Sequence, residues 1–208
     1  MASQFIIRPI RLEDAKYTYE IYRPYVEDNI TSFEYVMPSP EEWEARIGSI
    51  TAEYPYVVCE HNNEVIGYAY GTRHRYRTAY SWSVESAIYV SEKFHSSGVA
   101  RILYETLFAL LKLQGYVNVY AGVGMPNDKS EKFHRSMGFY DVGVFKKIGY
   151  KFGGWHDTKW FQMHLIDHPA ESPTLKMPAE IENTAAYKQI FEDANQKMEQ
   201  IISQRKPT

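Results

Sequence analysis

Apolar and polar positions along the chain follow two periods, one typical of strands and one typical of helices. Short apolar or alternating runs predict strands at 5–9, 56–60, 65–73, 81–90, 118–122, 139–145 and 160–165. Apolar side chains at helical spacing predict helices at 13–26, 99–113 and 130–137. This order of strands and helices predicts an α+β fold.

One helix start is signalled by local sequence alone. Ser39 can cap a helix, Pro40 suits the first helical position, and Glu42 completes a capping box. We therefore expect a helix that begins at Pro40 and runs through Trp43 and Ile47.

The amino-acid composition changes near Asp167, and this change suggests a boundary between two parts of the chain. We expect a domain at 1–166, a linker at 167–178 that contains two X-Pro pairs, and a C-terminal amphipathic helix at 179–208. The apolar stripe of that helix consists of Tyr187, Ile190, Phe191, Ala194, Met198, Ile201 and Ile202. This stripe can pack on its own domain, on a partner subunit or on a membrane surface. The mixture of Glu and Lys on the polar face disfavours the membrane.

Charge and cysteine content exclude several classes of protein. The 208 residues carry 23 basic and 26 acidic side chains, a net charge of −3, whereas nucleic-acid and polybasic membrane surfaces need clustered positive charge. The single cysteine, Cys59, excludes an intrachain disulfide and a cysteine-based zinc site. It fits a reducing compartment, so we expect a cytoplasmic protein without a metal. No apolar run is long enough to span a membrane.

The junction between a predicted strand and helix, from Val90 to Arg101, is the first candidate for chemistry. The small residues at 96–98 stand at the start of the helix, where backbone N–H groups and the helix dipole favour a phosphate. A plain helix cap would use the same residue types.

Acid–base and anion-binding candidates lie on either side of this junction. Glu85 alternates out of phase with the apolar positions of its strand, so it is either a solvated charge or a carboxylate that takes a proton from an amine. His134 stands alone on a short helix and is either a packing residue or a proton carrier. Arg75 and Arg77 alternate with Tyr76, so they form either a solvated pair or a fork for a carboxylate.

A series of ordered blocks resembles a known family. From about Ile6 to Leu165 the blocks include Arg8-Pro9, Phe33-Glu34, Trp82-Ser83-Val84-Glu85-Ser86, Pro126-Asn127-Asp128, Gly149-Tyr150-Lys151 and Trp155-His156-Asp157. In this order they resemble the GCN5-related N-acetyltransferase (GNAT) superfamily, and within it the phosphinothricin acetyltransferase-like branch. One position departs from the family pattern, because His95 stands where the phosphate loop usually begins with Gln or Arg.

The resemblance implies a fold and an activity. The fold would be the three-layer α/β/α-like GNAT fold, with a mixed, mostly antiparallel twisted sheet between helices. The enzyme would move acetyl directly from acetyl-CoA to the α-amino group of a small amino-acid-like acceptor such as phosphinothricin, methionine sulfoximine or methionine sulfone, and it would form a homodimer. Two alternatives remain open: an acetyltransferase for protein N-termini or other amines, and a non-catalytic acetyl-CoA-binding or assembly protein.

The resemblance also implies roles for particular residues. Glu85 would be the base and His134 the general acid or proton relay. Arg75 and Arg77 would hold the acid groups of the acceptor, and Phe33 and Tyr80 would flank its side chain. The acetyl-CoA site would consist of Ile88, Tyr89, Val90, Ser96, Ser97, Gly98, Val99, Ala100, Arg101 and Asn127.

Overall fold

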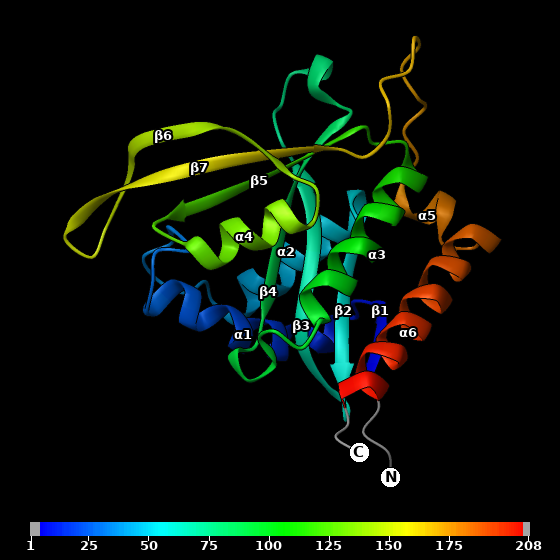
Figure 1. Ribbon diagram of the computed structural model, residues 1–208, viewed down its shortest axis with the longest axis horizontal. Helices are drawn as coiled ribbons and strands as arrows, with labels where there is room; N and C mark the ends of the chain where they lie inside the picture. Colours follow the sequence, from blue (N-terminus) through cyan, green and yellow to red (C-terminus); the bar gives the residue numbers. More distant parts are fainter. Residues whose placement is uncertain (1–4, 206–208) are drawn as a thin grey trace.

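The computed structural model describes residues 5–205 of the chain (Figure 1). Its strands are β1 (Phe5–Pro9), β2 (Tyr56–His61), β3 (Glu64–Arg73), β4 (Ser83–Val90), β5 (Asn118–Met125), β6 (Tyr140–Lys151) and β7 (Gly154–His164). Its α-helices are α1 (Ala15–Glu27), α2 (Pro40–Glu53), α3 (Val99–Gln114), α4 (Asp128–Ser136), α5 (Pro178–Ile181) and α6 (Ala185–Arg205). The α+β prediction is confirmed.

The strands form one mixed sheet in the order β1-β2-β3-β4-β5-β7-β6. All pairs are antiparallel except β4 with β5, which are parallel and pair only from Ser83 to Glu85. Beyond Glu85 the two strands no longer exchange backbone hydrogen bonds. The second half of β4 is therefore paired on one side only, by β3.

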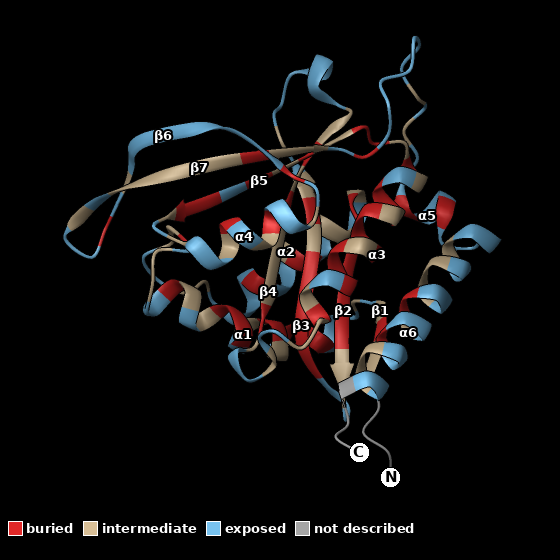
Figure 2. Cartoon of the chain, in the orientation of Figure 1, coloured by how far each residue is buried: buried red, intermediate tan, exposed pale blue. Residues whose placement is uncertain are grey.

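Helices cover both faces of the sheet, and each face has its own apolar cluster (Figure 2). Leu103, Leu107 and Leu111 of α3 pack on one face, and Tyr22 and Trp43 of α1 and α2 pack on the other. Because side chains alternate along a strand, neighbouring residues of β2 supply both clusters. The central strands are consequently covered on both sides.

The capping box at the start of α2 is confirmed. The Ser39 Oγ atom accepts a hydrogen bond from the Glu42 N–H at 3.2 Å, and the Glu42 Oε2 atom accepts one from the Ser39 N–H at 2.7 Å. Local side-chain chemistry therefore sets this helix boundary, as the sequence predicts.

The strands β6 and β7 are much longer than predicted. Instead of ending near 145 and starting near 160, they continue to a turn at Phe152 and Gly153 and form a hairpin that projects away from the rest of the molecule (Figure 1). Many of their side chains are exposed, so they lack the half-buried alternation that reveals a strand in a sequence.

The predicted C-terminal helix is interrupted, with α5 ending at Ile181 and α6 beginning at Ala185. Residues 206–208 of the predicted segment lie outside the described residues. The stripe packs on its own domain, against α3 and β1, with Ala194 and Met198 buried. Between residues 5 and 205, no helix is both long and apolar enough to cross a membrane.

A side chain of α6 also covers the outer edge of the sheet. The Asn195 Oδ1 atom accepts from the Ile7 N–H at 2.7 Å, and the Asn195 Nδ2 atom donates to the Ile7 carbonyl at 3.0 Å. The amide thus occupies backbone groups of β1 that a neighbouring strand would otherwise pair. An unpaired edge strand is a site for unwanted strand addition, so α6 protects this edge.

Candidate active site

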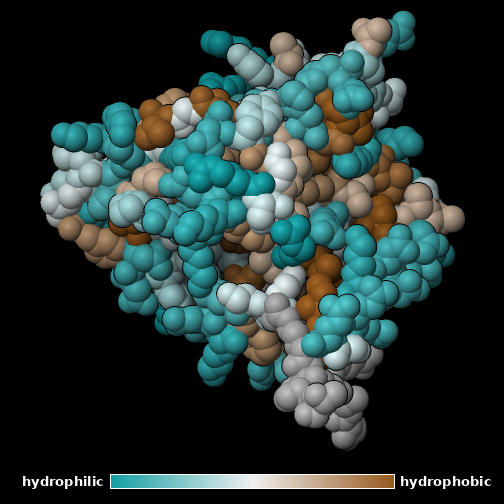
Figure 3. Space-filling model, in the orientation of Figure 1, coloured by the Kyte–Doolittle hydropathy of each residue, from teal (hydrophilic) through white to brown (hydrophobic). Residues whose placement is uncertain are grey.

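A groove of about 460 Å³ lies at the start of α3, beside the part of β4 that β5 leaves unpaired. In Figure 3 the surface is hollowed beside α4, with apolar side chains inside the hollow. The groove is lined by Tyr25, Thr31, Ile88, Val90, Phe94, His95, Ser96, Gly98, Ala100, Arg101, Asn127, Lys129, Ser130 and Phe133. Its strand side is apolar, and its loop and helix side carries Arg101 and Lys129. This gradient suits a ligand with an apolar arm and an anionic end.

The structure gathers most of the predicted cofactor residues in this groove. Its lining includes Ile88, Val90, Ser96, Gly98, Ala100, Arg101 and Asn127. The Asn127 side chain also caps α4, because its Oδ1 atom accepts from the Ser130 N–H at 3.0 Å. The helix-cap and groove interpretations of Asn127 are therefore compatible.

Three predicted cofactor residues direct their side chains elsewhere. Tyr89 points to the opposite face of the sheet, where it packs against Tyr22 and Tyr25. Val99 is completely buried, and the Ser97 hydroxyl donates to the Phe94 carbonyl at 2.6 Å. None of these three residues lines the groove, and the backbone N–H groups of Ser97 and Val99 already donate to the Phe94 carbonyl and the Ser97 hydroxyl.

Gly98 directly precedes α3, as its N-terminal cap, and has a backbone angle that favours glycine. Its φ is +95°, in the left-handed region. A Cβ atom at this position would lie 3.0 Å from the Cγ2 atom of Ile201 in α6. The loop is therefore bounded on one side by the groove and on another by the C-terminal helix.

His95, at the unusual position of this loop, contacts the Tyr25 hydroxyl at 3.4 Å and two closer partners. Its Nε2 atom lies 3.0 Å from the Val90 carbonyl, and its Nδ1 atom lies 3.3 Å from the Lys129 Nζ atom. Since Lys129 can only donate, Nδ1 accepts and the Nε2–H donates to Val90. The imidazole therefore fixes the loop to β4 and places a lysine at the groove, a residue that the sequence analysis did not single out.

Glu85 is the last residue of β4 that pairs with β5, and the two strands separate beyond it. Its Oε1 atom is 3.0 Å from the Nδ1 atom of His74, and its side chain is 34% exposed. Burial raises the pKa of the Glu85 carboxyl, although the hydrogen bond with His74 and the charge of Arg75 oppose that shift. The result is a partly accessible carboxylate with a higher proton affinity than an ordinary glutamate.

His134 is buried in the core and does not line the groove. Its ring stacks on Phe161 with centroids 5.5 Å apart, its Nδ1 atom lies 2.8 Å from the Ser130 carbonyl, and its Nε2 atom lies 3.3 Å from the Tyr104 hydroxyl. Burial lowers the pKa of the imidazole, which favours its neutral form. A proton could reach the groove from His134 only through a neighbour such as Ser130, which does line it.

The four predicted acceptor residues are not all in one place. Arg75 and Tyr80 lie near Glu85, with the Arg75 guanidinium 5.7 Å from the Tyr80 ring centroid. Arg77 is exposed and precedes the short 3-10 helix Thr78–Tyr80. Phe33 packs on the β6–β7 hairpin, where a Cβ on Gly149 would come within 2.8 Å of its ring. The structure therefore places Arg75 near the candidate base without an ion pair between them, and it leaves both arginines exposed.

The loop that carries Phe33 is anchored by a buried lysine that the sequence analysis quoted without assigning a role. The Lys151 Nζ atom donates to the carbonyls of Val26, Asn29 and Ser32 at 2.6, 2.9 and 2.7 Å. Lys151 is only 2% exposed, so water does not replace these bonds. It thereby ties the end of α1 and the following loop to β6.

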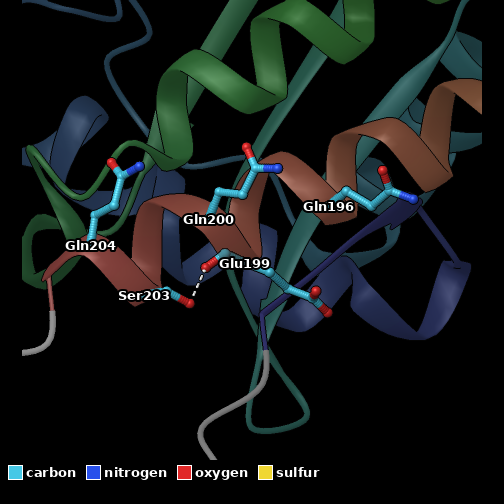
Figure 4. Close-up of a pocket in the computed structure, with 5 residues that line it drawn as sticks. All are labelled: Gln196, Glu199, Gln200, Ser203 and Gln204. Carbon is cyan, nitrogen blue, oxygen red and sulfur yellow. Dashed lines mark hydrogen bonds between the residues drawn. The ribbon is translucent and has the colours of Figure 1, made fainter.

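Another hollow runs along the outer side of α6 and has a different character (Figure 4). It is lined by Gln196, Glu199, Gln200, Ser203 and Gln204. None of the predicted site residues lies there. Within residues 5–205, no cluster of three or more His, Cys, Asp or Glu side chains is arranged to hold a metal ion.

Comparisons with known proteins identify the family of the chain. The acetyltransferase (GNAT) domain family matches residues 7–160. Phosphinothricin N-acetyltransferase of Streptomyces viridochromogenes is 35% identical over 156 residues, which cover 75% of this chain and 85% of that protein. The L-methionine sulfoximine/L-methionine sulfone acetyltransferase of Salmonella typhimurium is 32% identical over 117 residues, 56% of this chain and 68% of that protein.

A solved structure shows the same fold. The phosphinothricin acetyltransferase of Sinorhizobium meliloti, in complex with AcCoA, superposes with a TM-score of 0.78 at 33% identity and covers 87% of this chain and 98% of that one. The chain belongs to the GNAT family of acetyltransferases.

Proposed function

We propose that this enzyme transfers acetyl from acetyl-CoA to the α-amino group of a small amino-acid-like acceptor of the phosphinothricin or methionine sulfoximine type. The observation that carries the proposal is the position of Glu85, a half-exposed carboxylate at the point where β4 and β5 separate. The same strand continues from Glu85 into the groove through Ile88 and Val90. The names of the relatives support the acceptor class.

In the proposed reaction Glu85 takes the proton of the acceptor ammonium, directly or through a water. The neutral amine attacks the thioester carbon, so that a C–N bond forms while the C–S bond breaks and CoA leaves as a thiolate. His134 relays a proton toward that thiolate through its neighbours. Cys59 does not serve as a nucleophile, because it is completely buried and burial raises the pKa of its thiol to about 12.

For acetyl-CoA we propose the groove, with the pyrophosphate at the N-terminus of α3. Backbone N–H groups of the 96–101 segment would hold the phosphates, except those of Ser97 and Val99, which already donate to the Phe94 carbonyl and the Ser97 hydroxyl. The side chains of Arg101 and Lys129 would add positive charge. Ile88 and Val90 would contact the pantetheine arm. Residues 1–166 would form the catalytic domain, joined by 167–178 to the C-terminal segment 179–208.

Replacing Gly98 with Val should weaken acetyl-CoA binding. The new side chain would meet Ile201, and the left-handed backbone would be strained by about 1–3 kcal/mol. Calorimetry should show a clear loss of affinity for acetyl-CoA. Gly48→Val on α2 is the control, because a Cβ there meets nothing within 4 Å. Equal affinities for wild type and Gly98→Val would contradict the proposed cofactor site.

The acceptor site should prefer an acid to its amide. Arg75 near Glu85, and Arg77 on the same loop, are both exposed, so the preference would come from their attraction for the anion of the acceptor. Phosphinothricin or methionine sulfone should therefore have a higher kcat/KM than the matching amide. Arg75→Ala and Arg77→Ala should each raise KM for the acid and reduce that preference. Equal kcat/KM for acid and amide would instead favour a peptide N-terminus as acceptor.

We also propose that the enzyme is a cytoplasmic homodimer that associates through the β6–β7 hairpin. The single, buried thiol fits a reducing compartment. The hairpin exposes Val142, Val144, Phe145, Ile148, Tyr150, Phe152 and Trp155. Figure 3 shows hydrophobic side chains on the surface over β6. Exposed apolar side chains gathered on one element are typical of a contact with another protein.

Light scattering tests the homodimer. Wild type should have about twice the chain mass of 24.3 kDa. The double variant Val142→Glu/Trp155→Glu should shift toward the monomer, because it places charges among the exposed apolar side chains of the hairpin. Leu12→Glu, an exposed apolar residue far from the hairpin in sequence, should leave the mass unchanged. A monomeric wild type would exclude this assembly.

A further inference from the structure

A histidine that the sequence analysis did not single out contacts the candidate base. His74 follows the last residue of β3, and its Nδ1 atom lies 3.0 Å from the Glu85 Oε1 atom. Its ring stacks almost parallel on Tyr120 of β5, with centroids 4.3 Å apart and planes inclined by 6°. The imidazole therefore lies where β4 and β5 separate: it stacks on Tyr120 of β5 and hydrogen-bonds Glu85 of β4.

The other neighbours of His74 decide which nitrogen carries the proton. The Arg75 Nε atom lies 3.4 Å from the His74 Nε2 atom, and Arg75 can only donate. Nε2 is therefore the acceptor, and Nδ1–H donates to Glu85. Tyr80 and Trp160 approach the ring edge-on, with centroids 6.5 and 6.0 Å away.

We propose that His74 is a positioning residue for Glu85, whose carboxylate it orients toward the acceptor amine through the Nδ1–H bond. The proposal rests on the proposed role of Glu85 as the base. A hydrogen bond donated to a carboxylate favours the ionised form. His74 thus offsets part of the effect of burial and keeps the base ready to accept a proton.

The two side chains are not equally placed to meet a substrate. The His74 side chain is 11% exposed, whereas that of Glu85 is 34% exposed. Both ring nitrogens of His74 already have partners, in Glu85 and Arg75. Glu85 therefore faces the acceptor, and His74 acts through Glu85.

Two variants separate the hydrogen bond from the packing. His74→Phe keeps an aromatic ring for Tyr120 but removes the donor, and His74→Gln restores a donor without the ring. In His74→Phe, kcat should fall about ten- to a hundredfold, the range for a lost hydrogen bond to a charged group. The acidic limb of the kcat profile should move to higher pH, because the carboxylate loses the donor that favours ionisation. KM for acetyl-CoA should not change, and His74→Gln should recover part of the rate.

The results distinguish a failure of the proposed role of His74 from a failure of the proposed role of Glu85. Wild-type kcat and pH profile in His74→Phe would overturn the positioning role, as would an equal loss of rate at every pH with an unmoved acidic limb. An unimpaired Glu85→Gln enzyme would instead overturn the base itself. Nitrogen NMR of histidine-labelled wild type gives a second test that needs no variant. It should show Nδ1–H on His74 at neutral pH, and an Nε2–H tautomer would contradict the proposal.

Discussion

Glu85→Gln is expected to lower kcat by roughly 10²–10⁴, the usual range for removing a general base. An amide keeps the size of the side chain and its hydrogen bond with His74, but it cannot take a proton from the acceptor ammonium. Affinity for acetyl-CoA should be retained, since Glu85 does not line the groove as the structure defines it. Steady-state kinetics and calorimetry measure the two quantities separately.

The role of Glu85 as a base also predicts how kcat changes with pH. Burial raises the pKa of Glu85, so the acidic limb of the wild-type profile should lie above the ordinary value for glutamate, about 4.3. Activity should fall as the pH drops through that limb, and Glu85→Gln should lose it. Glu44→Gln, an exposed carboxylate on α2, is the control and should behave like wild type. An unchanged rate for Glu85→Gln at pH 7 would mean that solvent deprotonates the amine.

Lys151→Met is expected to lower the free energy of unfolding by about 3 kcal/mol or more. Met resembles the apolar stem of Lys in length but cannot donate to the carbonyls of Val26, Asn29 and Ser32. A buried polar group that loses its partner costs about 1–3 kcal/mol, and three carbonyls are affected here. Urea denaturation followed by circular dichroism measures the change.

The same substitution should also affect the acceptor side of the site. The loop after α1 carries Phe33, so its release should raise KM for the acceptor more than KM for acetyl-CoA. Lys146→Met is the matched control on the same strand: Lys146 pairs with Asp157 at 2.8 Å but is 76% exposed, so its loss should cost at most about 1 kcal/mol. Equal stability of Lys151→Met and wild type would show that water satisfies the three carbonyls.

The sequence by itself determined those features that depend on neighbouring residues. The capping box of α2 needs only Ser39, Pro40 and Glu42, so its position was predictable. Alternation along one strand sufficed to place Glu85 on the face opposite the buried positions. Likewise, the apolar stripe of α6 predicted a buried face, because 3.6-residue spacing is a local property. The ordered motifs added the family resemblance, and with it most of the groove residues.

Tertiary structure decided what depends on residues far apart in the chain. His74 meets Glu85 only because β3 pairs with β4, and Tyr120 stacks on His74 only because β5 runs beside β4. The partners of Lys151 lie more than a hundred residues from it along the chain, and Gly98 is equally far in sequence from Ile201, the residue of α6 that faces it. The length of the β6–β7 hairpin could not be predicted from the sequence either, because its side chains do not alternate between buried and exposed positions. Sequence patterns reflect interactions between residues that are close in the chain, whereas these contacts form only when the sheet has assembled.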